Sequence, residues 1–407
     1  MDNKTVNIGL IGFGTVGKGI YTVVGNSKNA NARIKKICVA DVNKDRGKEF
    51  ESVHSLLTDN YLEILDDPDI SLIVEVINDA ESAFNIVTES LKRRIPVVSG
   101  NKVMIARNLP TLLSLQREYN TALLYDASSC GSIPVIRNLE EYYDNDLLLE
   151  VKGILNGSSN YILSRVFDHG EEYEHALSKA IKSGFAESDP TFDIEGFDSL
   201  YKLIIITVHA LGVYVKPEDI FIFGISKIKN FDINWAREKR GKIKLVAQVV
   251  KFAEEKFTMF VMPELVEKSR YIYGVDDEYN GVVIRGEGYD RQFMFGKGAG
   301  GFPTASSILS DIMAIKRNYR YAYKKMSYID TPEYTMDVSL KVYIRYKTTD
   351  VIRLLPFDHI SENYVSDTEN YVIGEIKLDN LFQSKDILGE KDVFIINIPL
   401  FFKERDN

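Results

Sequence analysis

The sequence predicts an α/β protein that opens with a doubly wound dinucleotide-binding domain and continues into α+β domains. A short apolar strand, Val6 to Ile11, runs directly into a glycine-rich turn, Gly12 to Gly17, at the start of a helix. Apolar strands then alternate with helical patterns as far as Tyr125, which is typical of a parallel sheet covered by helices. From about Ile220 the pattern changes to alternating strands, which predicts a mixed sheet in a second domain.

The turn has the G-x-G-x-x-G spacing of a pyrophosphate-binding site. Gly12 permits the tight turn, Gly14 lets a phosphate approach the backbone, and Gly17 lets helix and strand pack closely. The helix N-terminus adds N–H groups and the positive end of the helix dipole. A glycine turn without a ligand is the alternative interpretation. We expect the cofactor to be bound by Gly12, Phe13, Gly14, Thr15, Val16 and Gly17.

A second predicted strand, Lys36 to Ala40, ends at Asp41. A carboxylate at this point can bind both ribose hydroxyls of NAD and repel the extra phosphate of NADP. Lys44 and Arg46 lie close behind and would suit NADP instead. The sequence therefore leaves NAD and NADP open.

The rest of the first domain is predicted from further alternation. The expected strands are Ser71 to Val76, Pro96 to Ser99 and Ala122 to Tyr125, and the expected helices are Ala80 to Lys92 and Leu109 to Tyr119. Ligands bind at the carboxyl ends of strands in such sheets. Lys102 lies just past one of these ends, where a plain surface lysine is the alternative.

A segment near the middle of the chain is rich in acids. Five carboxylates fall between Gly184 and Lys202: Glu187, Asp189, Asp193, Glu195 and Asp198. Asp198 and Lys202 are spaced to share one face of a helix, and the apolar run from Leu203 would bury that helix. Because a buried charge is costly unless it is paired or used, we expect a polar pocket for a small molecule with an amino group. The alternative is a solvated acidic loop that caps a core helix.

Three further segments are rich in small residues. The loop from Asp126 to Pro134 could ligate a monovalent cation through backbone carbonyls, or it could be a tight connection. A strand, Val151 to Leu155, leads through Asn156 to Asn160 into a helix at Tyr161 to Phe167, with hydroxyls placed to cap it. A second glycine-rich loop, residues 295–306, opens a long helix that reaches about Arg320.

Composition points to a soluble protein. The chain has 407 residues, 45% hydrophobic and 27% charged, which suits two or three globular domains. A net charge of −9 argues against a nucleic-acid surface. The longest apolar run, Leu203 to Val215, is too short to span a membrane. With Cys38 and Cys130 the only cysteines and no signal pattern, we expect a cytoplasmic protein.

Six blocks of this sequence, taken in order, resemble homoserine dehydrogenase. They are GFGTVG at 12–17, SGNKVMIA at 99–106, DASSCGSIPVI at 126–136, GILNGSSNYIL at 153–163, GFAESDPTFDIEGFDSLYK at 184–202 and GKGAGGFPTASSILSDI at 296–312. The resemblance implies a dinucleotide-binding domain of residues 1–135 and 302–325, a substrate and dimerisation domain of residues 136–301, and a C-terminal segment of residues 327–407. It also implies a homodimer or higher oligomer.

The resemblance assigns roles to particular residues. Lys202 matches the family's catalytic lysine, with Asp198 as its partner, and Lys102 matches a second active-site lysine. The substrate-binding positions it implies are Glu187, Asp193, Asn156 and Gly157, and further cofactor contacts are Ser99, Lys102 and Gly298. A sodium or potassium ion would be held by backbone oxygens of Asp126, Ser129, Gly131 and Ile133.

Some positions depart from the family's pattern. Asn78-Asp79 stands where a glycine pair is usual, Ala40 replaces an arginine, and the loop at 126–134 carries Ser129, Cys130 and Ser132 in place of glycines. These changes concern cofactor preference and the cation. They would also permit two alternatives: a non-enzymatic sensor of cofactor or amino acid, or a dehydrogenase for a related small amino acid. The retained Lys102, Asp198 and Lys202 favour an active enzyme.

The implied reaction interconverts L-homoserine and L-aspartate 4-semialdehyde by hydride transfer, in threonine and methionine biosynthesis. The protein must position the cofactor and handle one proton. We expect Lys202 to donate that proton in the reducing direction, because neighbouring carboxylates favour its charged form. None of the five histidines lies in a matching motif, so a histidine base is not expected.

The last eighty residues are predicted to form a small α+β appendage. The expected order is βαββαβ, with strands at 336–346, 359–365, 371–378 and 392–398 and helices at 351–355 and 381–387. This is the layout of the amino-acid-sensing ACT-type domain. The acidic-Pro-Gly turn usual after its first strand is replaced by Lys347-Thr-Thr-Asp350. We therefore predict that threonine feedback is absent or altered.

Overall fold

The computed structural model describes residues 5–252 and 255–399. The chain divides into two compact units, Met1–Asp144 with Lys297–Lys325 and Asn145–Gly296 with Met326–Asn407. The C-terminal segment, which the sequence assigns to a third domain, groups with the second unit. The strands of the C-terminal segment continue the sheet of the second unit, which explains this grouping.

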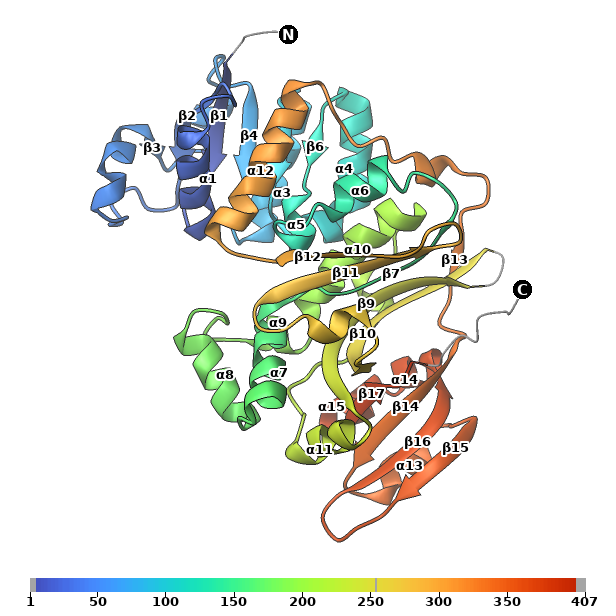
Figure 1. Cartoon of the computed structure of the whole chain (residues 1–407). Helices are drawn as coiled ribbons and strands as arrows, with labels where there is room; N and C mark the ends of the chain where they lie inside the picture. The colour runs from blue at the N-terminus through green and yellow to red at the C-terminus, as the bar shows by residue number, and fades with distance from the viewer. Residues whose placement is uncertain (1–4, 253–254, 400–407) are drawn as a thin grey trace. The chain divides into compact units, whose positions relative to one another are not determined.

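The first unit is a doubly wound α/β sheet, as predicted (Figure 1). Its strand order is β3-β2-β1-β4-β5-β6, and all its pairs are parallel. The strands are β1 (Val6–Ile11), β2 (Ala32–Cys38), β3 (Leu57–Thr58), β4 (Leu72–Glu75), β5 (Val97–Ser99) and β6 (Leu123–Leu124). The helices and turns are α1 (Thr15–Asn26), η1 (Lys48–Leu56), α2 (Leu62–Leu65), α3 (Ala80–Lys92), α4 (Lys102–Tyr119), α5 (Ala127–Cys130), α6 (Val135–Glu141), α12 (Gly301–Lys316) and η4 (Lys324–Ser327).

Several boundaries in this unit differ from the prediction, and two of them concern candidate site residues. β2 ends at Cys38, so Asp41 follows the strand by three residues. α4 begins at Lys102 and continues through Pro110, where we expected a start near Leu109. The earlier start is explained by Asn101, whose side chain accepts a hydrogen bond from Met104 N and caps the helix.

The core of the first unit joins residues from both ends of its sequence. Ile8 and Leu10 on β1 pack with Val74 and Val98, and Ile308 of the returning helix α12 completes the cluster. Close packing of α1 on α12 depends on Gly19, since a Cβ there would lie 2.4 Å from the carbonyl oxygen of Gly301. Helix α12, which lies in the sixth sequence block, is therefore part of the first unit's core.

The second unit contains one large mixed sheet (Figure 1). Its main path is β12-β11-β7-β9-β10-β17-β14-β16-β15, and β8 and β13 pair with β10. The strands before the C-terminal segment are β7 (Leu148–Ile154), β8 (Phe221–Ile222), β9 (Gly241–Phe252), β10 (Lys256–Glu267), β11 (Tyr279–Gly286) and β12 (Asp290–Lys297). The helices are α7 (Gly157–His169), α8 (Tyr173–Lys182), α9 (Thr191–Ile194), η2 (Pro217–Asp219), α10 (Phe197–Leu211), α11 (Asn230–Glu238) and η3 (Tyr271–Gly274).

The C-terminal segment forms an antiparallel sheet in the order β17-β14-β16-β15. Its elements are β13 (Glu333–Tyr334), β14 (Ser339–Tyr346), α13 (Thr349–Leu354), β15 (His359–Tyr364), β16 (Asn370–Lys377), α14 (Leu378–Gln383), α15 (Lys385–Glu390) and β17 (Phe394–Asn397). The expected βαββαβ order is present, with the second helix divided in two at Ser384. β17 pairs in parallel with β10 through Asn397 and Glu264, which makes this sheet continuous with its neighbour.

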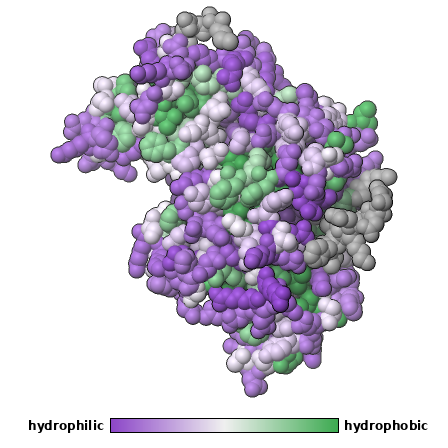
Figure 2. All heavy atoms as spheres, viewed as in Figure 1, coloured by the Kyte–Doolittle hydropathy of each residue, from purple (hydrophilic) through white to green (hydrophobic). Residues whose placement is uncertain are grey.

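The described residues include no helix that is long and apolar enough to cross a membrane. On the face drawn in Figure 2 the surface is mainly hydrophilic, with scattered apolar areas. Such areas are ordinary on folded proteins.

Helix α1 offers a matched test of this packing. Gly19→Ala should destabilise the protein by about 1–3 kcal/mol, because the new methyl meets backbone atoms of α12. Gly25→Ala in the same helix meets nothing within 4 Å and should be neutral or stabilising by up to about 1 kcal/mol. Urea denaturation midpoints measure both, and equal midpoints for the two variants would contradict the close approach.

Candidate active site

The acid and the lysine of the central segment form a buried ion pair at the start of α10. Lys202 Nζ lies 2.6 Å from Asp198 Oδ2, one helical turn apart. Lys202 Nζ also donates to the backbone oxygen of Leu155, at 2.6 Å. The exposed fractions of the two side chains are 8% for Lys202 and 3% for Asp198. The predicted pair therefore exists, and its charges are compensated within the protein.

Asn156 joins this pair to a second carboxylate. Its side-chain nitrogen donates to Asp198 Oδ2 at 2.9 Å and to Asp193 Oδ1 at 2.7 Å. Its side-chain oxygen accepts from the backbone N–H of Ser159 and caps α7. Asn156, predicted to bind substrate, thus holds Asp193 and Asp198 side by side.

Burial raises the pKa of Asp193, and the negative charge of Asp198 raises it further. A positively charged group placed beside Asp193 would offset both effects. Asp193 lies in the short helix α9, which directly precedes α10. The site is therefore suited to a ligand with an ammonium group.

The other two substrate-binding candidates are placed differently. Gly157 begins α7, and a Cβ there would lie 2.6 Å from the backbone oxygen of Glu278. Its lack of a side chain permits a close backbone approach. Glu187 lies exposed in the stretch between α8 and α9, while Asn156, Asp193, Asp198 and Lys202 are brought together.

Sequence reasoning missed two groups beside the lysine. The backbone oxygen of Leu155 accepts from Lys202 and also from the side chain of Asn280, at 2.9 Å. Asn280 is fully buried on β11. A lone asparagine in a strand carries no distinguishing pattern, so only the structure could reveal it.

The glycine-rich turn of the first unit has the backbone geometry that its sequence predicts. Gly12 has a φ of +100°, which favours glycine. A Cβ on Gly17 would lie 2.3 Å from the Gly12 carbonyl oxygen, whereas one on Gly14 would meet nothing within 4 Å. Gly14 and Thr15 are exposed at the N-terminus of α1, and Phe13 and Gly17 are buried behind them. The turn therefore leaves open backbone where a pyrophosphate would bind.

Asp41 and Arg46 have different environments. Asp41 is exposed, and its carboxylate accepts a hydrogen bond from Asn43 N at 2.8 Å. The guanidinium of Arg46 donates to the backbone oxygens of Asp41, Val42 and Lys44, so it holds its own loop together. Lys18 donates to the backbone oxygen of Arg46 at 2.7 Å and ties the loop to α1.

A buried carboxylate, which sequence reasoning also missed, organises the strand ends near Lys102. Glu75 accepts from Ile77 N at 2.8 Å and from Ser99 Oγ at 2.5 Å. Ser99 Oγ in turn accepts from the backbone N–H of Asn101, the cap of α4. Lys102 is the first residue of that helix. The carboxyl ends of β4 and β5 and the start of α4 are thus fixed by one network.

The loop proposed for a cation contains the short helix α5, where we expected irregular structure. The carboxylate of Asp126 accepts from Ile136 N and Arg137 N, so it caps α6. Its backbone N–H donates to Asp311 Oδ2, and burial raises the pKa of both carboxyls. Ser129 and Ile133 are buried in this loop.

Among the described residues no group of histidine, cysteine and acidic side chains could hold a metal ion. The cation site, which would use backbone oxygens, stays a prediction.

Gly131 and Gly298 meet in the first unit. A Cβ on Gly131, whose φ is +56°, would lie 2.5 Å from the Gly298 carbonyl oxygen. Ser132 N and Oγ both donate to the backbone oxygen of Lys297, each at 3.0 Å. The loop at 126–134 therefore packs against Lys297 and Gly298 of the second glycine-rich loop, as the small residues allow.

The Glu75 carboxyl should make stability depend on pH. Burial raises the pKa of Glu75 from 4.5 to about 7, so the folded state keeps a proton that the unfolded state loses. Stability from this group is full below pH 4.5 and declines as the pH rises towards 7, by up to about 3 kcal/mol. Urea unfolding at several pH values should show this decline in the wild type and a smaller one in Glu75→Gln. An identical pH dependence in both would contradict the assignment.

Two successive stretches of the chain match family models. Residues 12–126 match the NAD binding domain of homoserine dehydrogenase, and residues 134–313 match its homoserine dehydrogenase domain. Among curated relatives, homoserine dehydrogenase of Bacillus subtilis is 32% identical, over 81% of this chain and 77% of its own length. That of Lactococcus lactis is 30% identical, over 95% of this chain and 88% of its own.

Solved structures agree. A homoserine dehydrogenase from Thiobacillus denitrificans superposes with a TM-score of 0.83 at 27% identity, covering 97% of this chain and 98% of that one. A hyperthermophilic archaeal homoserine dehydrogenase in complex with NADPH has a TM-score of 0.65 at 25% identity, covering 78% of this chain and 99% of that one. With these matches, the buried acid–lysine pair and the dinucleotide turn have a common explanation: the chain belongs to the homoserine dehydrogenase family of NAD(P)-dependent oxidoreductases.

Proposed function

We propose that this protein interconverts L-homoserine and L-aspartate 4-semialdehyde, with Lys202, Asp198 and Asp193 as the residues that handle the substrate. The observation that carries the proposal is the buried cluster in which Asn156 links both carboxylates and Asp198 pairs with Lys202. NAD or NADP, when bound, supplies the hydride acceptor or donor.

The substrate's ammonium group would bind at Asp193. Burial and the charge of Asp198 raise the pKa of this carboxyl, and an ammonium group would relieve that unfavourable environment. Glu187, exposed before α9, remains a second candidate for this group. Asn156 and Gly157 support the site through capping and backbone packing.

Lys202 would exchange the proton of the substrate oxygen. A lysine ammonium has three donors, and Lys202 uses two of them in its hydrogen bonds to Leu155 and Asp198. The remaining donor can bind the alkoxide that forms in the reducing direction and neutralise its charge. Asp198 keeps Lys202 oriented while it does so. Lys102, the first residue of α4, remains a second candidate for an active-site lysine.

For the cofactor we infer a preference for NAD. Asp41 is exposed, and the guanidinium of Arg46 is occupied by three backbone oxygens of its own loop. An exposed carboxylate at this position favours the ribose hydroxyls and repels a 2′-phosphate. A monovalent cation at the 126–133 loop and a homo-oligomer remain further parts of the proposal, as does the absence or alteration of threonine feedback.

The main test is the initial rate of homoserine oxidation, followed by nicotinamide absorbance. Lys202→Ala should lower kcat by about 10²–10⁴-fold, because the proton-transfer group is lost. Lys182→Ala, which changes an exposed lysine on α8, is the matched control and should keep wild-type rates. Near-normal turnover with an unchanged pH profile in Lys202→Ala would reject the role of this lysine.

The cofactor preference has its own test. Asp41→Asn should raise the ratio of the NADP rate to the NAD rate by about tenfold, since a like-charge repulsion of about 1.4 kcal/mol is removed. Asp45→Asn, an exposed acid in the same loop, serves as the comparison and should leave the ratio unchanged. Equal ratios in Asp41→Asn and the wild type would assign the choice to other residues.

A further inference from the structure

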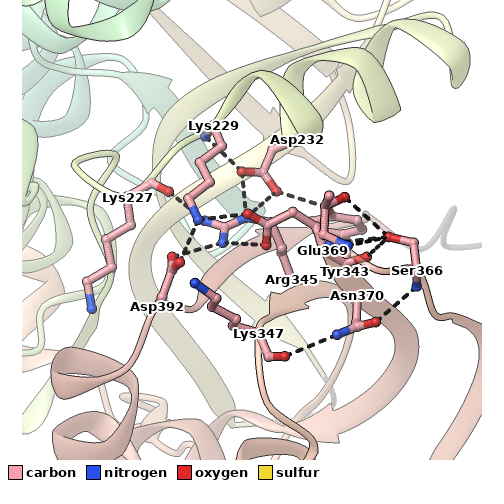
Figure 3. A network of polar contacts seen from close by, with 11 residues as sticks. Lys227, Lys229, Asp232, Tyr343, Arg345, Lys347, Ser366, Glu369, Asn370 and Asp392 are labelled. Atoms are coloured by element: carbon pink, nitrogen blue, oxygen red, sulfur yellow. Dashed lines mark hydrogen bonds and ion pairs between the residues drawn. The ribbon is translucent and has the colours of Figure 1, made fainter.

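The C-terminal sheet contains a fully buried arginine that binds residues outside it (Figure 3). Arg345 on β14 donates through Nε to both oxygens of Asp232, at 3.0 Å each. Asp232 belongs to α11 and is also fully buried. Arg345 Nη1 donates to Asp392 at 2.9 Å, and Nη2 donates to the backbone oxygen of Lys227 at 2.7 Å. One side chain of the C-terminal segment thus holds α11 and the stretch that precedes it.

We call residues 223–229 the crosspiece. Its two lysines also reach the C-terminal segment. Lys227 Nζ donates to the backbone oxygens of Leu388, Gly389 and Lys391, at 2.9, 2.6 and 2.8 Å. Lys229 Nζ forms ion pairs with Glu369 and Asp392. The crosspiece is therefore attached to the C-terminal segment by the side chain of Lys227. The main-chain oxygen of Lys227 and the side chain of Lys229 add the contacts that Figure 3 shows.

The other end of the crosspiece contacts the end of α9, next to Asp193. Ile225 N donates to the backbone oxygen of Ile194, the last residue of α9, at 2.7 Å. Gly224 lies so close to this turn that a Cβ would be 2.4 Å from Ile194 O and 2.5 Å from Glu195 Cα. Ile194 is adjacent to Asp193, whose carboxylate accepts from Asn156. A displacement of the crosspiece would therefore displace Asp193.

We propose that the C-terminal segment is a positioning part of the substrate site. Through Arg345 and Lys227 it holds the crosspiece against α9, and the crosspiece keeps Asp193 beside Asn156 and Asp198. This inference rests on the proposed function, because it assigns Asp193 to substrate binding. It concerns the binding of substrate, because the crosspiece contacts α9 at Ile194, whereas Lys202 and Asp198 lie on α10.

Lys227→Met is the informative variant. It removes three hydrogen bonds to residues 388–391 and leaves the buried Arg345 and Asp232 paired. We expect the KM for homoserine to rise by about fivefold or more, with kcat and the KM for NAD within about twofold of wild type. A purely structural role would change stability without this division between KM and kcat.

A matched control and a second variant complete the experiment. Lys377→Met removes an exposed ion pair with Asp337 on the same sheet and should leave all constants unchanged. Gly224→Ala disturbs the crosspiece at its other end and should reproduce the rise in KM for homoserine, which keeps the test valid if Lys227→Met does not fold. A KM within twofold of wild type in every folded crosspiece variant would overturn the inference.

Fluorescence provides a readout that does not depend on turnover. Trp235 is the only tryptophan of the chain, and it lies buried on α11, with its ring centroid 4.2 Å from that of Tyr343. Tyr343 donates to Asp232 in the same network. Titration with homoserine should change Trp235 emission in the wild type, with a weaker apparent affinity in Lys227→Met. No change in a wild type that oxidises homoserine would count against the inference alone, whereas a wild type without homoserine turnover would overturn both proposals.

Discussion

A lysine and an aspartate buried together at the first turn of an apolar helix impose the main constraint on the second unit. Taking such charges out of water costs several kcal/mol for each ion, so nearby groups must compensate them. The backbone oxygen of Leu155 at the end of β7 and the side chain of Asn156 supply that compensation. Because both come from the junction of β7 and α7, the strand, the two helices and α9 must meet at one point. The geometry of the site is thus a condition for burying the pair.

A comparable arrangement lies in the first unit. Glu75 sits at the end of a buried parallel strand, and burial raises its pKa to about 7. Its hydrogen bonds to Ile77 and Ser99, and the bond from Asn101 to Ser99, hold the strand ends against the start of α4. Each unit therefore contains a buried polar network at the position where a ligand is expected. In each unit the network fixes the backbone that carries a candidate lysine.

The C-terminal segment continues the sheet of the second unit, and its contacts are more polar than those of an ordinary core. Arg345 and Asp232 are fully buried. Removing one member of such a pair leaves the other charge buried without a partner, which is far more destabilising than replacing both with apolar residues. This chemistry gives the segment a defined orientation on α11 and the crosspiece. It also explains why a segment with the layout of a separate sensing domain groups with the second unit.

Local patterns in the sequence were sufficient for features that depend on neighbours in the chain. The glycine spacing from Gly12 to Gly17 predicted the turn, because backbone freedom and close approach are properties of single residues. The four-residue spacing of Asp198 and Lys202 predicted their contact, because helix geometry fixes it. The strand and helix order of the C-terminal segment followed from periodicity in the same way.

Features that join distant residues were decided by the tertiary structure alone. Asn280 reaches Leu155 across 125 residues, and Arg345 reaches Asp232 across 113. Neither residue is marked by a local pattern, since their partners are selected by strand pairing and packing. The use of Asp126 as a cap for α6 was likewise set by hydrogen bonds to residues ten and eleven positions further along the chain. The sequence by itself determined the family, the fold class and the charged cluster, while the partners of each buried charge depended on how the sheets brought them together.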